Sequence, residues 1–188
     1  DIFYHFEQSY AKHADLDPTE ANVHAKYSWY YLNTYITNKT DGQIFVVDGQ
    51  QRLTTLTLML IGLYHLCGPA SLNSPDLRDW LKAKIAGVGV GGKRQFWMAH
   101  SKREPLMQAL FSGTEPAEDM IDDGITARHI IENYGLIQGE LATRLPTRHK
   151  LDTFIFYFLC MVVIINLEVA QTDVPMVFEV INDRGVRL

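Results

Sequence analysis

The run Asp48-Gly49-Gln50-Gln51-Arg52 combines residue types that can hold a phosphate group. It lies between a short apolar segment and a long apolar segment with helical character, so it forms a polar corner between two elements. Gly49 lets the backbone turn sharply and lets a ligand come close to it. The helix that follows begins with free N–H groups and a positive dipole end, where an anion fits. Arg52 lies one turn into that helix and has a planar guanidinium suited to phosphate.

A purely structural interpretation of the same corner stays open. Asp48 could be the N-cap of the helix, accepting a hydrogen bond from the N–H of Gln50 or Gln51. Arg52 could be a surface charge near the corner. Strand–glycine–helix corners are also common in α/β proteins that bind no ligand there, so spacing alone leaves both interpretations standing.

The elements that position the corner are predicted from composition and periodicity. The β-branched and aromatic side chains from Ile44 to Val47 predict a buried strand. The apolar positions from Leu53 to Leu66 are too many for a strand and predict a helix buried on most sides. Trp29 to Ile36 has the composition of a preceding strand. Asn38 to Gly42 contains Asp-Gly, which indicates a hairpin turn between the two strands.

The rest of the chain is predicted to be mainly helical. Helices are expected at Asp1–Lys12, Leu77–Ile85, Lys102–Phe111 (after the capping box Ser101–Glu104), Ile125–Leu145 and Thr147–Cys160, and after a cap at Thr172 or Asp173. Short strands are expected at Gln95–Met98 and Met161–Val169, and loops at Ala14–Ala25, at Gly87–Gly92 and in the acidic stretch Thr114–Gly124.

Two motifs resemble those of a known family. Asp48-Gly49-Gln50-Gln51-Arg52-Leu53-Thr54-Thr55-Leu56 resembles the hallmark of the GmrSD-type restriction endonucleases, in their GmrS-like N-terminal domain. At the far end, Phe178-Glu179-Val180-Ile181-Asn182-Asp183-Arg184-Gly185-Val186-Arg187-Leu188 is similar to the family's Phe-x-x-x-Asn-x-Arg-Gly-x-x-Leu signature. The two motifs occur in the family's order, and the middle of the chain, from about Gly68 to Arg148, carries no matching motif.

The resemblance implies an α+β fold similar to ParB and sulfiredoxin. We predict a small ParB-like sheet lobe in residues 1–70 that contains the corner. A mainly helical part in residues 71–188, ending in the second motif, is predicted to pack on this lobe as a single domain. The family's upstream Ile-Pro-x-Tyr-Gln-Arg-type motif has no match here, and the chain stops at Leu188 where the family continues. We therefore expect a piece of a longer protein.

The resemblance further implies a domain that binds and hydrolyses a nucleoside triphosphate with Mg²⁺. This hydrolysis would control a His-Asn-His-type nuclease domain, on the same or a separate chain, in a cytoplasmic defence system against modified phage DNA. The residues assigned to catalysis are Asp48, Gln51 and Arg52, with Asp48 orienting water or the metal ion. The residues assigned to phosphate binding are Gly49, Gln50, Gln51, Arg52, Asn182 and Arg184.

Two other functions remain open. A ParB-like fold could cut DNA directly, although no carboxylate cluster or catalytic histidine pairs with the corner in the sequence. The corner could instead bind a DNA phosphate in a non-catalytic sensing module. For the second motif, Asn182 could be a helix C-cap and Arg184 a surface charge.

Composition limits these choices. The chain has 188 residues, and its net charge of −5 argues against a broad electrostatic grip on DNA. Cys67 and Cys160 lie in apolar surroundings and are predicted to be buried thiols in a reducing compartment. None of the seven histidines forms a two-histidine motif with metal spacing. The apolar segment Phe154–Leu167 is too short to span a membrane and is predicted to be a buried helix running into a buried strand.

Overall fold

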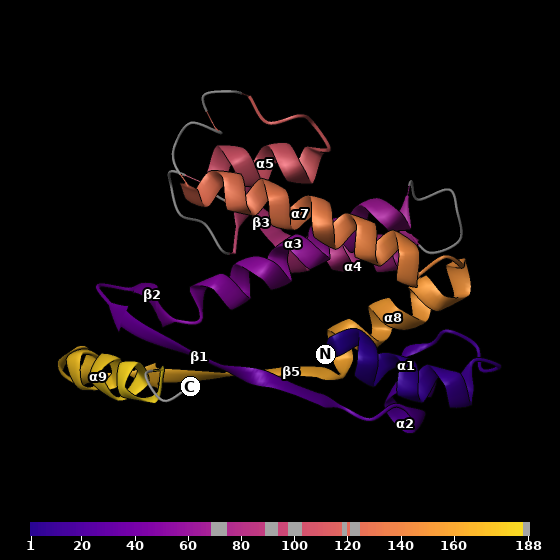
Figure 1. Cartoon of the computed structure of the whole chain (residues 1–188), viewed down its shortest axis with the longest axis horizontal. Helices are drawn as coiled ribbons and strands as arrows, with labels where there is room; N and C mark the ends of the chain where they lie inside the picture. Colours follow the sequence, from indigo (N-terminus) through magenta and orange to yellow (C-terminus); the bar gives the residue numbers. More distant parts are fainter. Residues whose placement is uncertain (69–74, 89–93, 98–102, 118–119, 121–124, 186–188) are drawn as a thin grey trace.

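The computed structural model describes residues 1–68, 75–88, 94–97, 103–117, 120 and 125–185. The fold is α+β, as predicted. Within the described residues, a three-stranded sheet and a two-stranded sheet are combined with a larger set of helices. In Figure 1 the three-stranded sheet extends from the helical body along the lower side of the molecule, and the last helix lies at its far end.

Helix α3 (Gln50–Cys67) is the element around which the other helices are arranged. It contributes Met59 and Leu63 to one apolar core and Leu58 and Ile61 to another. A helix whose apolar residues face both sides in this way must be covered on both sides to be stable. The prediction that the segment after the corner is a helix buried on most sides is therefore confirmed.

The first core is closed mainly by α1 (Ile2–His13), α2 (Glu20–Lys26) and α8 (Arg148–Cys160). Leu77 and Leu81 of α4 and Leu141 of α7, two helices described below, also belong to it. Aromatic rings fill its centre. The Phe6 ring meets the Phe154 ring edge to face, with 5.0 Å between the ring centroids. Contacts of this kind add to the free energy gained by burying the rings. The helices predicted at Asp1–Lys12 and Thr147–Cys160 are confirmed as α1 and α8.

Helix α2 corrects the prediction of a loop from Ala14 to Ala25. Thr19 begins the helix, because its side chain accepts a hydrogen bond from the N–H of Asn22 at 3.2 Å. The helix has one fully buried apolar side chain, Val23, which is 1% exposed. A single buried residue gives no periodic pattern, so the sequence did not reveal the helix.

The second core lies on the other side of α3. It is formed with α4 (Pro75–Ile85), α5 (Glu104–Ser112), α7 (Ile125–Arg144) and the small sheet of β3 (Ala86–Val88) and β4 (Arg94–Phe96). All three helices and the strand near Gln95 were predicted. The other predicted features here, Gly89, Gly91 and Gly92, the capping box at Ser101 and most of the acidic stretch Thr114–Gly124, lie outside the described residues.

The three-stranded sheet has the order β2-β1-β5, with β1 (Tyr30–Thr40) in the middle. β2 (Gln43–Asp48) is antiparallel to β1, and β5 (Val162–Val169) is parallel to it. The predicted Asp-Gly hairpin is confirmed: Asp41 and Gly42 both have positive φ, at 52° and 77°. Two successive residues of this kind match the twist of the strands in a type I′ hairpin.

Two of the strands are less buried than predicted. In β2, Ile44 is 67% exposed and Phe45 is 50% exposed. In β5, Val163, Ile165 and Leu167 are also exposed on one face. Both strands lie at an edge of the sheet. Their β-branched residues predicted the strands correctly, but the prediction that the strands are buried is wrong.

After β5 the chain continues through the short 3-10 helix η2 (Gln171–Asp173) into α9 (Val174–Gly185). The apolar segment Phe154–Leu167 is divided between α8 and β5, as predicted. Within the described ranges, no helix has the length and hydropathy that a membrane crossing requires.

Candidate functional site

The corner between β2 and α3 is built on Gly49. Gly49 is the N-cap residue of α3 and has φ 89° and ψ 9°, in the left-handed region. A Cβ atom at this position would lie 2.7 Å from Tyr35 Cβ and 3.2 Å from Tyr35 Cα. The close approach therefore comes from the β1 backbone, and glycine is required both by its φ and by this neighbour.

Arg52 is half-buried and folds back over the corner. Its Nη1 donates a hydrogen bond to the backbone carbonyl of Thr34 in β1. The same nitrogen would be 3.2 Å from a Cβ at Gly49, so the guanidinium lies beside the glycine. Arg52 is thus a positioned side chain and not a surface charge in bulk water. A guanidinium has five N–H donors, and Thr34 accepts from one nitrogen.

Asp48 closes β2 and is half-buried. It pairs with Ile36 of β1, whereas the preceding pair is Thr37 with Val46, so Val47 is an extra residue in β2. Bulges of this kind redirect the strand and are frequent next to functional sites. Asp48 is one residue ahead of the N-cap of α3, so the interpretation of Asp48 as the N-cap is wrong.

The first turn of α3 has no side-chain cap. The N–H of Leu53 donates a hydrogen bond to the Gly49 carbonyl oxygen at 2.9 Å, as in the first turn of an α-helix. The N–H groups of residues 50 to 52 precede this bond, and an α-helix has no partner for such groups within itself. In contrast, α2 and α8 each begin at a threonine whose side chain accepts from the helix backbone.

The two glutamines of the corner differ in their surroundings. The Gln50 side-chain amide donates to Val46 O at 2.8 Å and holds the corner to β2. Gln51 is exposed at the start of the helix. Gln50 is exposed as well, so the two side chains differ in the hydrogen bond that Gln50 makes to β2 and not in their exposure.

The structure describes residues 182 and 184 as part of α9, but their side chains lie outside the described part. The helix continues through Asn182 to Gly185, so the alternative interpretation of Asn182 as the helix C-cap is wrong. In the sheet, β1 lies between the strand that leads to α3 and the strand that leads to α9. A role for Asn182 and Arg184 at the corner stays a prediction.

Residues of β1 were missed by the sequence reasoning. Thr34 receives the Arg52 hydrogen bond, and Tyr35 lies against Gly49. Part of this signal was available in the hairpin: a two-residue turn at Asp41-Gly42 sets the register, and counting back places Tyr35 opposite Asp48. The bulge at Val47, which the count does not reveal, places Ile36 there instead.

Two side-chain hydrogen bonds connect β1 to β5, the strand that precedes α9. Thr37 Oγ1 donates to Asn166 Oδ1 at 2.9 Å, and Asn38 Nδ2 donates to Val169 O at 3.0 Å. Thr37 and Asn38 are buried, and buried polar groups of this kind fix a register when they are hydrogen-bonded. These bonds set the position of β5 relative to the β1 segment that contacts the corner.

The two cysteines agree in part with the prediction of buried thiols. Cys67 is buried and Cys160 is half-buried. Burial raises the pKa of the Cys67 thiol above its ordinary value, and the nearby Arg148 acts in the opposite direction. Burial also raises the pKa of the Cys160 thiol. Neither cysteine lies in the β2–α3 corner, so the corner's chemistry does not involve a thiol.

Comparison with known proteins gives one match. The profile described as the GmrSD restriction endonuclease, N-terminal domain, matches residues 14–188. No curated protein and no solved structure matches the chain, so the similarity to ParB and sulfiredoxin stays a prediction. The profile includes both motifs and all of the corner. The chain therefore belongs to the GmrSD restriction endonuclease N-terminal domain family, which ties it to a defence system that acts on DNA.

Proposed function

We propose that this domain binds and hydrolyses a nucleoside triphosphate at the β2–α3 corner. In this proposal, hydrolysis controls a His-Asn-His-type nuclease domain that cuts modified DNA. The observation that carries the proposal is the uncapped start of α3, an 18-residue helix that begins at a glycine. Its first N–H groups and its dipole favour a bound anion, and the Arg52 guanidinium lies beside them.

The contacts of the corner divide its residues into two roles. The Gln50 amide and one nitrogen of Arg52 are engaged by backbone carbonyls of β2 and β1, so they hold the corner in shape. The N–H groups of residues 50 to 52, the remaining guanidinium donors and the exposed Gln51 amide are the groups that would contact phosphate oxygens. Because the donors are fixed before binding, little reorganisation is needed to stabilise developing charge.

Asp48 fits the Mg²⁺ that the family resemblance implies. Asp48 is half-buried and is the last residue of β2, directly before Gly49. Mg²⁺ in phosphoryl-transfer sites is held by one or two carboxylates together with the substrate phosphates. The ion, when bound, would neutralise charge on the phosphate oxygens. Asp48 would hold it, and Gln51 would orient the attacking water.

The proposal is tested by phosphate release from a panel of nucleoside triphosphates with Mg²⁺. We expect release by the wild type and its loss in Asp48→Asn and Arg52→Lys. The lysine variant keeps the charge but not the planar fork that reaches both Thr34 O and a phosphate. Arg144→Lys is the matched control, since Arg144 forms surface ion pairs with Glu140 and Glu7 on another part of the molecule.

DNA assays on the same variants separate the other two functions. Cutting of DNA by the domain without any triphosphate would support a nuclease and contradict the proposal. DNA binding that weakens with salt and in Arg52→Lys, without phosphate release, would support a sensing module. Release that persists in both corner variants would place the hydrolytic site elsewhere.

A further inference from the structure

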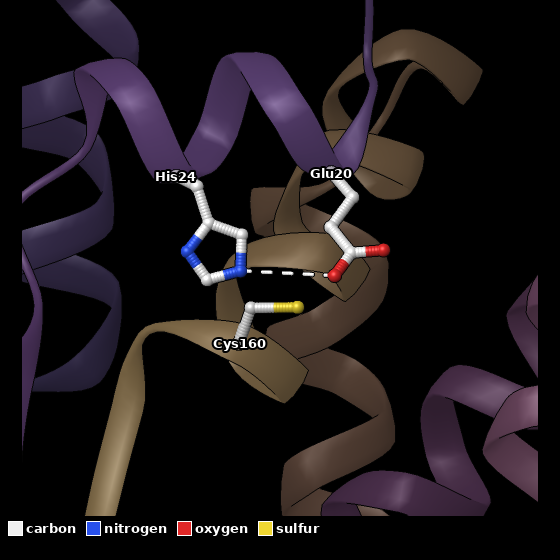
Figure 2. A group of neighbouring side chains, drawn as sticks. All are labelled: Glu20, His24 and Cys160. Carbon is white, nitrogen blue, oxygen red and sulfur yellow. Dashed lines mark ion pairs between the residues drawn. The ribbon is translucent and has the colours of Figure 1, made fainter.

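Away from the β2–α3 corner, three metal-binding side chains converge at the junction of α2 and α8. Glu20 and His24 lie one turn apart on the same face of α2, and Cys160 ends α8. A carboxylate oxygen, an imidazole nitrogen and the sulfur of these residues all lie within 4.8 Å of one another. Figure 2 shows the three side chains directed toward a common point between the two helices.

We propose that Glu20, His24 and Cys160 bind a zinc ion. Zn²⁺ takes sulfur, imidazole and carboxylate ligands in a tetrahedral arrangement, at about 2.0 to 2.3 Å from the ion. Ligand atoms around such an ion are therefore roughly 3.3 to 3.8 Å apart. The distance from His24 Nε2 to Glu20 Oε1, 3.7 Å, lies at the long end of this range, so the nitrogen and the oxygen need to move only slightly closer. Small rotamer adjustments bring the sulfur into place, and a water molecule completes the four ligands.

An ion pair alone does not account for this arrangement. The distance of 3.7 Å between Glu20 and His24 is too long for a hydrogen bond. The two side chains are 59% and 53% exposed, and an exposed pair of this kind contributes little to stability. The sulfur is a third donor from a distant part of the chain. A thiolate with an imidazole favours Zn²⁺ over Mg²⁺ or Ca²⁺, which prefer oxygen ligands.

The position of the site indicates a structural role. Helix α2 leads into β1, and α8 leads into β5. The two strands begin side by side, where the Tyr30 N–H donates to Met161 O at 2.8 Å. Zinc would therefore fasten the two helices at the point where both strands enter the sheet. This role is independent of nucleotide hydrolysis at the corner.

Cobalt substitution tests the site directly, with reduced protein that carries no histidine tag. We expect Co²⁺ to give a thiolate charge-transfer band and the visible bands of a tetrahedral ion, and Zn²⁺ to displace it. Cys160→Ser should abolish the charge-transfer band, and His24→Ala should weaken Zn²⁺ binding by more than about tenfold. Cys67→Ala and His129→Ala are matched controls that should leave both signals unchanged.

Thermal unfolding gives a second readout on the same proteins. Zn²⁺ should raise the melting temperature of the wild type and of the two control variants, but not that of Cys160→Ser. Far-ultraviolet circular dichroism without metal checks that each variant folds. The proposal is overturned if wild-type protein gives no thiolate band with Co²⁺, or if the band persists in Cys160→Ser.

Discussion

Replacing Gly49 by alanine should destabilise the protein by roughly 2–5 kcal/mol. Part of this cost is backbone strain, since an L-residue at φ 89° loses about 1–2 kcal/mol. The rest is steric, because the new Cβ would lie 2.7 Å from Tyr35 Cβ and 3.2 Å from Tyr35 Cα. Both atoms are fixed to the β1 backbone and cannot rotate away, and forced overpacking typically costs about 1–3 kcal/mol.

Gly42→Ala is the matched control for this experiment. Gly42 has φ 77°, but a Cβ there would meet nothing within 4 Å. It should therefore cost only the strain, about 1–2 kcal/mol. Urea unfolding followed by circular dichroism gives both values, with an unchanged m-value as the check that the unfolded state is the same. If Gly49→Ala costs no more than Gly42→Ala, then β1 does not press against the corner and the account of the site is wrong.

Three further substitutions test other parts of the fold. Burial raises the pKa of Tyr157 to about 12, and its hydroxyl has no hydrogen-bond partner among the described residues. Ionisation of this hydroxyl therefore favours the unfolded state: it leaves stability unchanged below the unfolded pKa of about 10 and lowers it as the pH rises from about 10 to 12. Tyr157→Phe should reduce this alkaline loss and leave stability at neutral pH unchanged or higher, in urea unfolding at several pH values. Asn38→Ala should lower the free energy of unfolding by about 1–3 kcal/mol, because it removes the hydrogen bond to Val169 O. Lys39 is exposed, so Lys39→Ala should change stability little, and equal effects of the two variants in urea unfolding would contradict the role of Asn38. Gly135→Ala should raise the melting temperature, with a gain of about 0.5–1 kcal/mol, since a Cβ there meets nothing within 4 Å inside helix α7.

Local signals predicted the elements of the corner well. The Asp41-Gly42 dipeptide predicted the hairpin, and the length of the apolar segment after Arg52 predicted α3. These features depend on the backbone preferences of a few neighbouring residues and on periodicity, which the sequence displays directly.

Features that depend on distant contacts were not predictable in the same way. The exposure of Ile44 and Phe45 follows from the edge position of β2, which is a property of the strand order and not of β2 itself. The contacts of Gly49 with Tyr35 and of Arg52 with Thr34 depend on a bulge in the hairpin register. The close approach of Tyr35 to Gly49 joins two distant segments, so the residues around Gly49 do not display it.

The extension of α9 through Asn182 shows the same limit at the second motif. Asparagine is common at helix ends, so Asn182 could have been the C-cap of this helix. The structure continues the helix to Gly185. A local preference for a cap is a weak signal, and the neighbouring helical residues outweigh it.

In the proposed function, the peptide N–H groups at the start of α3 bind a phosphate group. Backbone amide resonances measured by nuclear magnetic resonance test it most directly, during titration with a non-hydrolysable nucleoside triphosphate and Mg²⁺. We expect saturable shifts of the Gln50, Gln51 and Arg52 amides, which are reduced in Arg52→Lys and retained in Arg144→Lys. Resonances of these three amides that stay unmoved at saturating nucleotide, while others shift or none do, would contradict it.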